Sequence, residues 1–133
     1  MRSQSNKYRK RNKDHAQKRK SWGEEKNLCQ VCNYRSVTEV HHIAGRNAKA
    51  RDEVAKRYEC EKNWLAVCRR CHSMIDKECP AYWACAAKML AGELDLAHLQ
   101  ILSPGRKFSI DDYEIKEVVE YVLQWRMIKK QPL

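Results

Sequence analysis

The sequence predicts a small α+β domain held together by a four-cysteine zinc site, with additional C-terminal helices. Three observations predict this fold class. The chain has 133 residues, which suits one small domain. Two Cys-x-x-Cys pairs have the spacing of metal ligands. Short β-favouring runs lie near these pairs, and sequence with a helical apolar period follows them.

Positive charge is concentrated at the N-terminus. The chain has 27 Lys and Arg against 17 Asp and Glu, and residues 1–20 hold nine of these bases with one acid, Asp14. Because this segment has almost nothing apolar to bury, we expect a flexible basic arm over residues 1–20 and a single domain over residues 21–133. A basic arm on a near-neutral body predicts a polyanionic partner, and nucleic acid is favoured over an anionic membrane surface.

Composition also argues against a membrane-spanning protein, a secreted protein and a disulfide-bonded protein. The longest largely apolar stretch, residues 81–91, is about half the length of a transmembrane span and contains Lys88. No apolar segment of a secretory signal follows the basic N-terminus, so we expect a cytoplasmic protein. In a reducing compartment, the seven cysteines are expected to be metal ligands or free thiols rather than disulfides.

The first structured region is expected to be short strands. Trp22 and Leu28 predict an entry segment that packs on the body. Residues 29–43 then predict two short strands, because they contain β-favouring side chains after a tight cysteine turn. A charged connection follows, in which residues 48–59 favour a short exposed helix.

The rest of the chain is predicted to be helical. Pro80 suits the first position of a helix that Gly92 would end. A final helix over 111–129 would place apolar side chains at i, i+3, i+4, i+7 and i+8, which is a packing face. The predicted helices cover residues 68–77, 80–91, 93–100 (a short turn or helix) and 111–129.

The two cysteine pairs carry the most specific signal in the chain. Cys29 and Cys32 form one pair, Cys68 and Cys71 form the other, and 35 residues separate the two pairs. A two-residue spacer lets both thiolates of a pair reach one tetrahedral Zn²⁺, and two pairs complete its coordination. Such a closed site predicts a structural zinc rather than a catalytic one. The remaining cysteines lack paired spacing and are expected to be core residues or free thiols: Cys60, Cys79 and Cys85.

Histidines and one asparagine lie beside these pairs, in the runs EVHHI and NWLAVCRRCH. Adjacent histidines on a strand diverge, so His41 and His42 can take different roles. With Asn63 and His72, these runs resemble the HNH endonucleases of the ββα-metal superfamily, in the branch held by a four-cysteine zinc site. The resemblance covers about residues 27–77, with a helical extension at 80–130 outside it. Small phage or prophage members have this size and layout, which would place the protein in an infected bacterial cell.

The resemblance implies a role for each residue. His41 and His72 would ligate one catalytic divalent cation (Mg²⁺, Mn²⁺, Ni²⁺ or Zn²⁺). His42 would be the general base, with one ring nitrogen held by a backbone carbonyl, and Asn63 would hold the loop that carries it. The implied activity is metal-dependent hydrolysis of DNA, by nicking or double-strand cleavage, leaving 3′-hydroxyl and 5′-phosphate ends.

Several neighbouring residues have two open interpretations. Asp76 lies one helical turn after His72, where it could reach the same metal or serve as a solvated ion-pair partner. Glu39 alternates with His41, so it could support the ligands or be a surface residue. His15 and His98 are interpreted as surface or structural residues. Candidate phosphate contacts are Arg46, Arg69, Arg70, Lys7, Arg9, Lys10 and Arg11.

Alternative functions remain at this point. One is a zinc-held nucleic-acid-binding module without catalysis, and another is a nuclease for branched DNA or RNA. No segment resembles a base-reading recognition helix, so weak sequence preference is expected. Protein partners are possible within each alternative.

Overall fold

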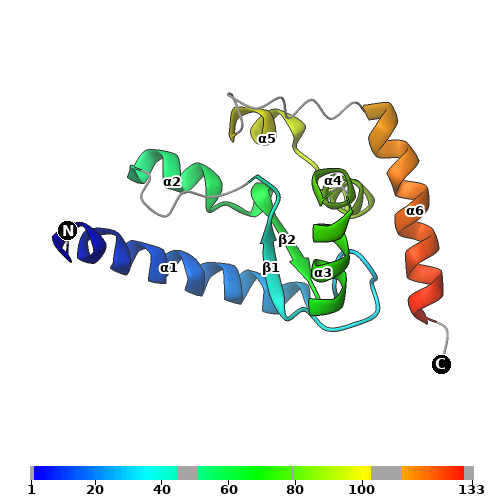
Figure 1. Cartoon of the computed structure of the whole chain (residues 1–133), viewed down its shortest axis with the longest axis horizontal. Coiled ribbons are helices and arrows are strands. Elements are labelled where there is room, and N and C mark those ends of the chain that lie inside the picture. The colour runs from blue at the N-terminus through cyan, green and yellow to red at the C-terminus, as the bar shows by residue number, and fades with distance from the viewer. Residues whose placement is uncertain (1, 45–50, 79, 103–111, 131–133) are drawn as a thin grey trace.

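The computed structural model describes residues 2–44, 51–78, 80–102 and 112–130, and it is a mixed α and β fold (Figure 1). Six α-helices and one short 3-10 helix surround a two-stranded sheet in this described part of the chain. In chain order the elements are α1 (Arg2–Lys26), β1 (Glu39–His42), α2 (Asp52–Tyr58), η1 (Glu61–Asn63), β2 (Trp64–Val67), α3 (Arg69–Lys77), α4 (Pro80–Leu90), α5 (Leu96–Leu102) and α6 (Asp112–Lys130).

The sheet joins the two regions that carry the candidate site residues. β1 and β2 are antiparallel, with His41 opposite Leu65 and His42 opposite Trp64. β2 is buried along its whole length and leads directly into α3. The second strand therefore comes from 64–67, not from the 29–43 segment as predicted. Within 29–43, residues 30–35 form turns and bends that bring Cys29 and Cys32 into the interior.

The N-terminal segment differs from the expected flexible arm. Residues 2–26 form one helix, so the boundary predicted after residue 20 falls inside α1. The C-terminal part of α1 packs on the sheet: the Trp22 and Trp64 ring centroids are 5.6 Å apart. A Cβ at Gly23 would lie 3.1 Å from the Val40 side chain, so the close approach favours glycine. Side chains from another part of the fold, Asp52 and Glu59, pair with Arg11 and Arg19 and offset the positive charge of α1.

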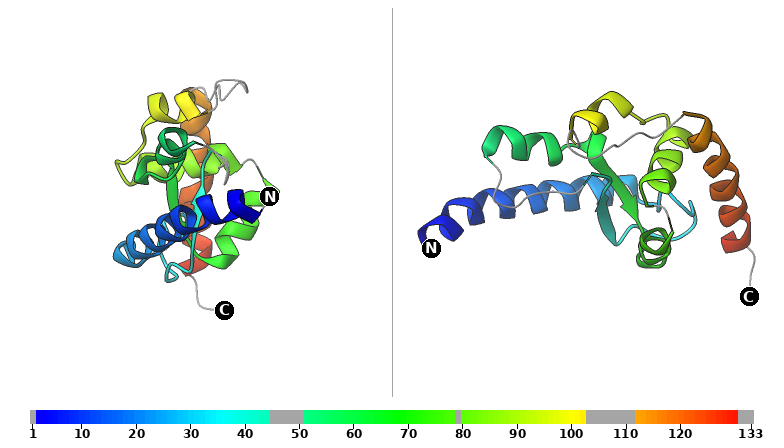
Figure 2. Two further views of the ribbon diagram at one scale, coloured as in Figure 1. Left: turned by 90° about the vertical axis from the view of Figure 1, so that its left-hand side faces the viewer. Right: turned by 45° about the horizontal axis from the view of Figure 1, so that its top comes forward.

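The C-terminal helices form a second packed layer. α6 packs along α4, with Ile115 and Val122 fully buried, as the apolar period predicts. Leu123 of the same predicted face is 38% exposed. Gly92 ends the α4 region in the left-handed conformation, as expected for a helix stop. The views of Figures 1 and 2 place α6 at one end of an elongated molecule and the N-terminal part of α1 at the other.

Candidate metal centres

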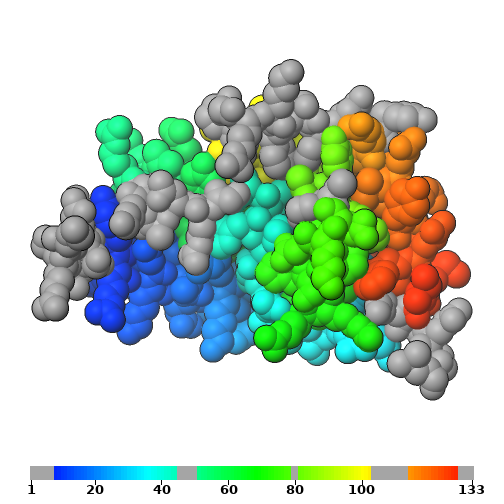
Figure 3. All heavy atoms as spheres, viewed as in Figure 1, coloured from blue at the N-terminus to red at the C-terminus, as the bar shows by residue number. Residues whose placement is uncertain are grey.

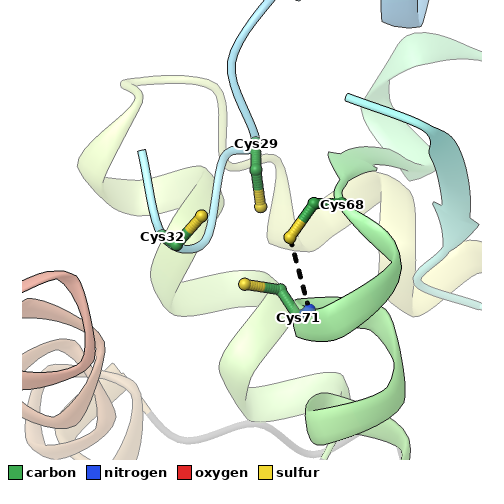
Figure 4. Close-up of side chains that lie close together, drawn as sticks. All are labelled: Cys29, Cys32, Cys68 and Cys71. Atoms are coloured by element: carbon green, nitrogen blue, oxygen red, sulfur yellow. Dashed lines mark hydrogen bonds between the residues drawn. The ribbon is translucent and has the colours of Figure 1, made fainter. Parts of the chain in front are cut away.

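Cys29, Cys32, Cys68 and Cys71 form a buried cluster whose Sγ atoms lie within 4.8 Å of one another (Figure 4). Two come from the turn after α1, and the other two come from the cap and first turn of α3. In the first turn, Asn33 takes the left-handed conformation and its N–H donates to the Cys29 carbonyl. The four thiols and their burial fit a structural metal site, as the paired spacing predicts.

Hydrogen bonds to sulfur support this cluster from three directions. The backbone N–H of Cys71 donates to Cys68 Sγ at 3.4 Å, and that of Arg35 donates to Cys32 Sγ at 3.5 Å. The Trp125 indole of α6 donates to Cys71 Sγ at 3.3 Å. N–H donors stabilise thiolates, which are the form that binds a metal.

The crowding of the sulfurs separates their pKa values. The hydrogen bond with Cys32 is the main reason that the pKa of Cys29 rises to about 11. The same bond lowers the pKa of Cys32, because it stabilises the charged form of that partner. A bound cation would allow all four groups to be thiolates together.

A second cluster joins the sheet to α3. Nδ1 of His41 lies 3.1 Å from Nε2 of His72, and Asp76 Oδ2 lies 3.8 Å from the same His72 nitrogen. The three residues offer ligand atoms within 4.8 Å of one another. On its other side, His72 Nδ1 lies 3.3 Å from Glu39 Oε2. Glu39 is 39% exposed and contacts His72, which is the arrangement expected of a residue that supports a ligand.

This donor set fits a divalent cation. Two nitrogens that ligate one zinc ion at about 2.0–2.1 Å with tetrahedral geometry lie roughly 3.3–3.4 Å apart, close to the separation of His41 and His72. Nε2 of His41 is buried and has no hydrogen-bond partner among the described residues. Burial, followed by the neighbouring His72, lowers the pKa of His41 to about 4 and keeps it in the neutral form that ligates metals.

His42 lies on the opposite face of β1 from His41. Its Nε2 contacts Oε1 of Glu59, a carboxylate that also pairs with Arg19 of α1. The Glu59 side chain is only 6% exposed, and the indole of Trp64 donates to it at 3.4 Å. The partner that the structure describes for Nε2 of His42 is therefore a buried carboxylate, which the sequence analysis did not name. The divergence of the two adjacent histidines is as predicted.

Asn63 is fully buried and holds together two distant points of the backbone. Its Oδ1 accepts from the Ala44 N–H at 2.7 Å, and its Nδ2 donates to the carbonyls of Ala44 and Tyr58, both at 3.0 Å. These bonds close the chain between residues 44 and 58 next to the end of β1. Asn63 thus links the end of β1 to the end of α2.

The predicted phosphate contacts divide into several groups. Arg69 and Arg70 are exposed on the first turn of α3, and Arg9 and Lys10 are exposed on α1. Arg11 instead pairs with Asp52 at 2.8 Å and lies over the Tyr8 ring. The side chain of Lys7 and the whole of Arg46 lie outside what the structure describes, as does Cys79. Cys85 is buried and Cys60 half-buried, both outside the metal clusters as predicted.

Three supporting residues are absent from the sequence-based predictions. Glu59 sits in a strongly charged segment, where one more carboxylate gives no signal. Trp125 was included only in a helix, with no link to the cysteines. Gln30 lies between Cys29 and Cys32, and its side chain accepts from the Ala66 N–H at 2.9 Å, which ties the cysteine turn to β2. The sequence signal for this contact is the position of the polar Gln30 between the two cysteines.

Comparison of the chain with protein families, curated proteins and solved structures gave no match. The helices of the described residues include none with the length and apolar character needed to cross a membrane.

Proposed function

We propose that this protein is a zinc-held, divalent-metal-dependent endonuclease of the HNH type that hydrolyses phosphodiester bonds in DNA. One observation carries the proposal: His41 of β1 and His72 of α3 meet at 3.1 Å beside Asp76, in a cluster open to solvent. The strands β1 and β2 followed by α3 would form a ββα-metal motif, and the four cysteines would hold a structural zinc.

His41 and His72 would hold the catalytic cation, with Asp76 as a third candidate ligand. When bound, such a cation neutralises charge on the scissile phosphate and on the leaving oxygen. The side chain of His72 is 25% exposed, whereas Nε2 of His41 is buried. A phosphate could therefore approach from the His72 side.

His42 would be the general base. When its Nε2 donates to Glu59, the neutral imidazole carries its lone pair on Nδ1. In the proposed step, Nδ1 takes a proton from water while the water oxygen bonds to phosphorus. The bond from phosphorus to the 3′ oxygen breaks, and that oxygen gains a proton from solvent. The products have 3′-hydroxyl and 5′-phosphate ends.

DNA would be held chiefly through its phosphates. The exposed cations described in α1 lie on its solvent side, and Arg69 and Arg70 lie beside the histidine cluster. These cations of α1 are Arg9, Lys10, Lys13, Lys18 and Lys20. Each phosphate neutralised contributes about 0.9 to the slope of log affinity against log salt. This mode of binding gives little sequence preference, so the proposed nuclease would cut many sequences.

The test is cleavage of supercoiled plasmid with Mg²⁺, Mn²⁺, Ni²⁺ or Zn²⁺ added in turn. We expect wild type to nick or linearise the plasmid and His42→Ala to be slower by about 10²–10⁴-fold, the usual contribution of a general base. His98→Ala is the matched control, because His98 bonds to the Arg57 carbonyl away from both clusters. If no metal supports cleavage while wild type still binds DNA, the nuclease proposal fails and a non-catalytic binding module is favoured.

A further inference from the structure

We propose that a groove beside the histidine cluster binds a single-stranded segment of the nucleic acid, next to the phosphate that is cut. The inference rests on the proposed function and names its preferred substrate: DNA with an unpaired flank. The groove lies between the first cysteine turn, α3 and the C-terminal part of α6. In Figure 3, α3 (green) faces the viewer directly beside α6 (orange to red).

The groove is large, and hydrogen bonds connect the elements that form its walls. Its volume is about 970 Å³, at the upper end of the roughly 300–1,000 Å³ typical of ligand sites. One wall is fixed by the cysteine cluster, because Cys68 lines it. The opposite wall is fixed by Trp125 and by Arg126, which donates to the carbonyls of Gln30 and Val31 at 2.9 Å. The three elements therefore form one preorganised surface.

The charge of the groove favours a polyanion. Four cations line it, namely Arg35, Arg69, Arg70 and Lys77, against one acid, Glu78. Within the described ranges, none of these four side chains forms an ion pair. Other arginines of the chain, such as Arg11 and Arg19, are paired with carboxylates. Unpaired cations gathered in a concave site would attract successive phosphates of one strand.

An exposed aromatic side chain favours a single strand over a duplex. Tyr34 lines the groove and is 54% exposed, on a turn that the cysteines hold. Bases of a duplex stack on their neighbours and leave no face for a side chain. An unpaired base can stack on an aromatic ring, which is how many proteins bind single strands without sequence preference.

The groove is continuous with the candidate catalytic cluster. Thr38 lines the groove and precedes Glu39, which contacts His72. Arg69 and Ser73 also line it, and they flank His72 on α3. A strand whose phosphate lies at His72 would therefore pass its next nucleotides into the groove. This arrangement would favour frayed, branched or single-stranded sites over continuous duplex.

The binding test uses zinc-loaded protein without any other added metal, and fluorescence anisotropy with two probes. The probes are a labelled oligothymidylate and a blunt duplex of equal length. We expect Tyr34→Ala to weaken oligothymidylate binding by roughly tenfold, the size of one lost base stack, and duplex binding by less than about twofold. Tyr121→Ala is the matched control, because Tyr121 is 58% exposed on α6 outside the groove.

Two variants that each remove one positive charge extend the test. Arg70→Ala should lower oligothymidylate affinity and reduce its salt slope by about 0.7, the value for one phosphate of a single strand. Lys116→Ala, an exposed cation of α6 outside the groove, should change neither quantity. If Tyr34→Ala weakens both probes equally, or neither, the groove proposal is overturned.

Cleavage separates this proposal from the proposed function. We expect wild type to cut a duplex with a single-stranded flank faster than a blunt duplex, and Tyr34→Ala to lose that preference. If cleavage occurs with no such preference, the groove proposal fails while the nuclease stands. If Tyr34-dependent binding occurs without any cleavage, the nuclease proposal fails while single-strand binding by the groove is supported.

Discussion

The two candidate metal centres share α3 but differ in their access to solvent. Cys68 and Cys71 at the start of the helix belong to a cluster in which all four side chains are at most 4% exposed. On the same helix, His72 is 25% exposed and Asp76 is 57% exposed. A closed set of ligands has no position for a substrate, whereas an open set does. Neighbouring residues of one helix thus belong to two clusters, one closed to solvent and one open to it.

The largest expected effect is the loss of the metal at the cysteine cluster. We expect one zinc per chain, and we expect chelation to unfold the domain, because structural zinc contributes about 10–16 kcal/mol in small zinc-binding units. Metal analysis and circular dichroism before and after chelation would measure this. A chelated protein that keeps its helical signal and its melting transition would contradict the structural role of the cluster.

A substitution in the open cluster of His41, His72 and Asp76 should reduce activity and leave stability nearly unchanged. We expect His72→Ala to reduce plasmid cleavage by at least about 100-fold, while the free energy of unfolding changes by less than about 1 kcal/mol, because the side chain is partly exposed. The rate of nicking and the thermal midpoint are the two measurements. The distinction between the two centres would be contradicted if His72→Ala lost much of its stability while each folded molecule kept the wild-type activity.

A smaller effect is expected at the contact between α6 and the closed cluster. Trp125→Phe removes the N–H that donates to Cys71 Sγ and keeps an aromatic ring. Groups that hydrogen-bond to metal ligands commonly change metal affinity by about 10–100-fold, so zinc should transfer faster to a competing chelator. Trp83→Phe, in α4, is the control. Equal transfer rates for wild type and Trp125→Phe would show that the indole does not support the site.

The smallest effect concerns Cys85, a buried thiol outside both clusters. Burial raises its pKa from the ordinary 9.0 to about 12. A raised folded-state pKa contributes stability that is complete below pH 9 and is lost as the pH rises toward about 12. Cys85→Ala should therefore cost about 1 kcal/mol near pH 7, from the lost packing, and less at higher pH. Denaturant unfolding of both proteins across this range measures the difference, and a constant difference would contradict the shift.

Sequence patterns predicted the parts of the fold that depend on interactions between residues close together in the sequence. The Cys-x-x-Cys spacing located the closed cluster, and the apolar period located most of the packing face of α6. The helix at α1 was not predicted, because its charge repulsion is offset by Asp52 and Glu59, which lie far away in the sequence. The carboxylate beside His42 was missed for the same reason. Ion pairs and hydrogen bonds between residues far apart in the sequence produce no periodic pattern that could predict them.

The bonds that Asn63 makes to Ala44 and Tyr58 also bear on how this architecture can diversify. One buried amide bonds to the backbone at both ends of the intervening segment, and the residues of the two clusters lie outside that segment. Doubling a loop costs only about 0.6 kcal/mol of closure entropy. We therefore expect sequence inserted between residues 44 and 58 to leave the residues of both clusters in place.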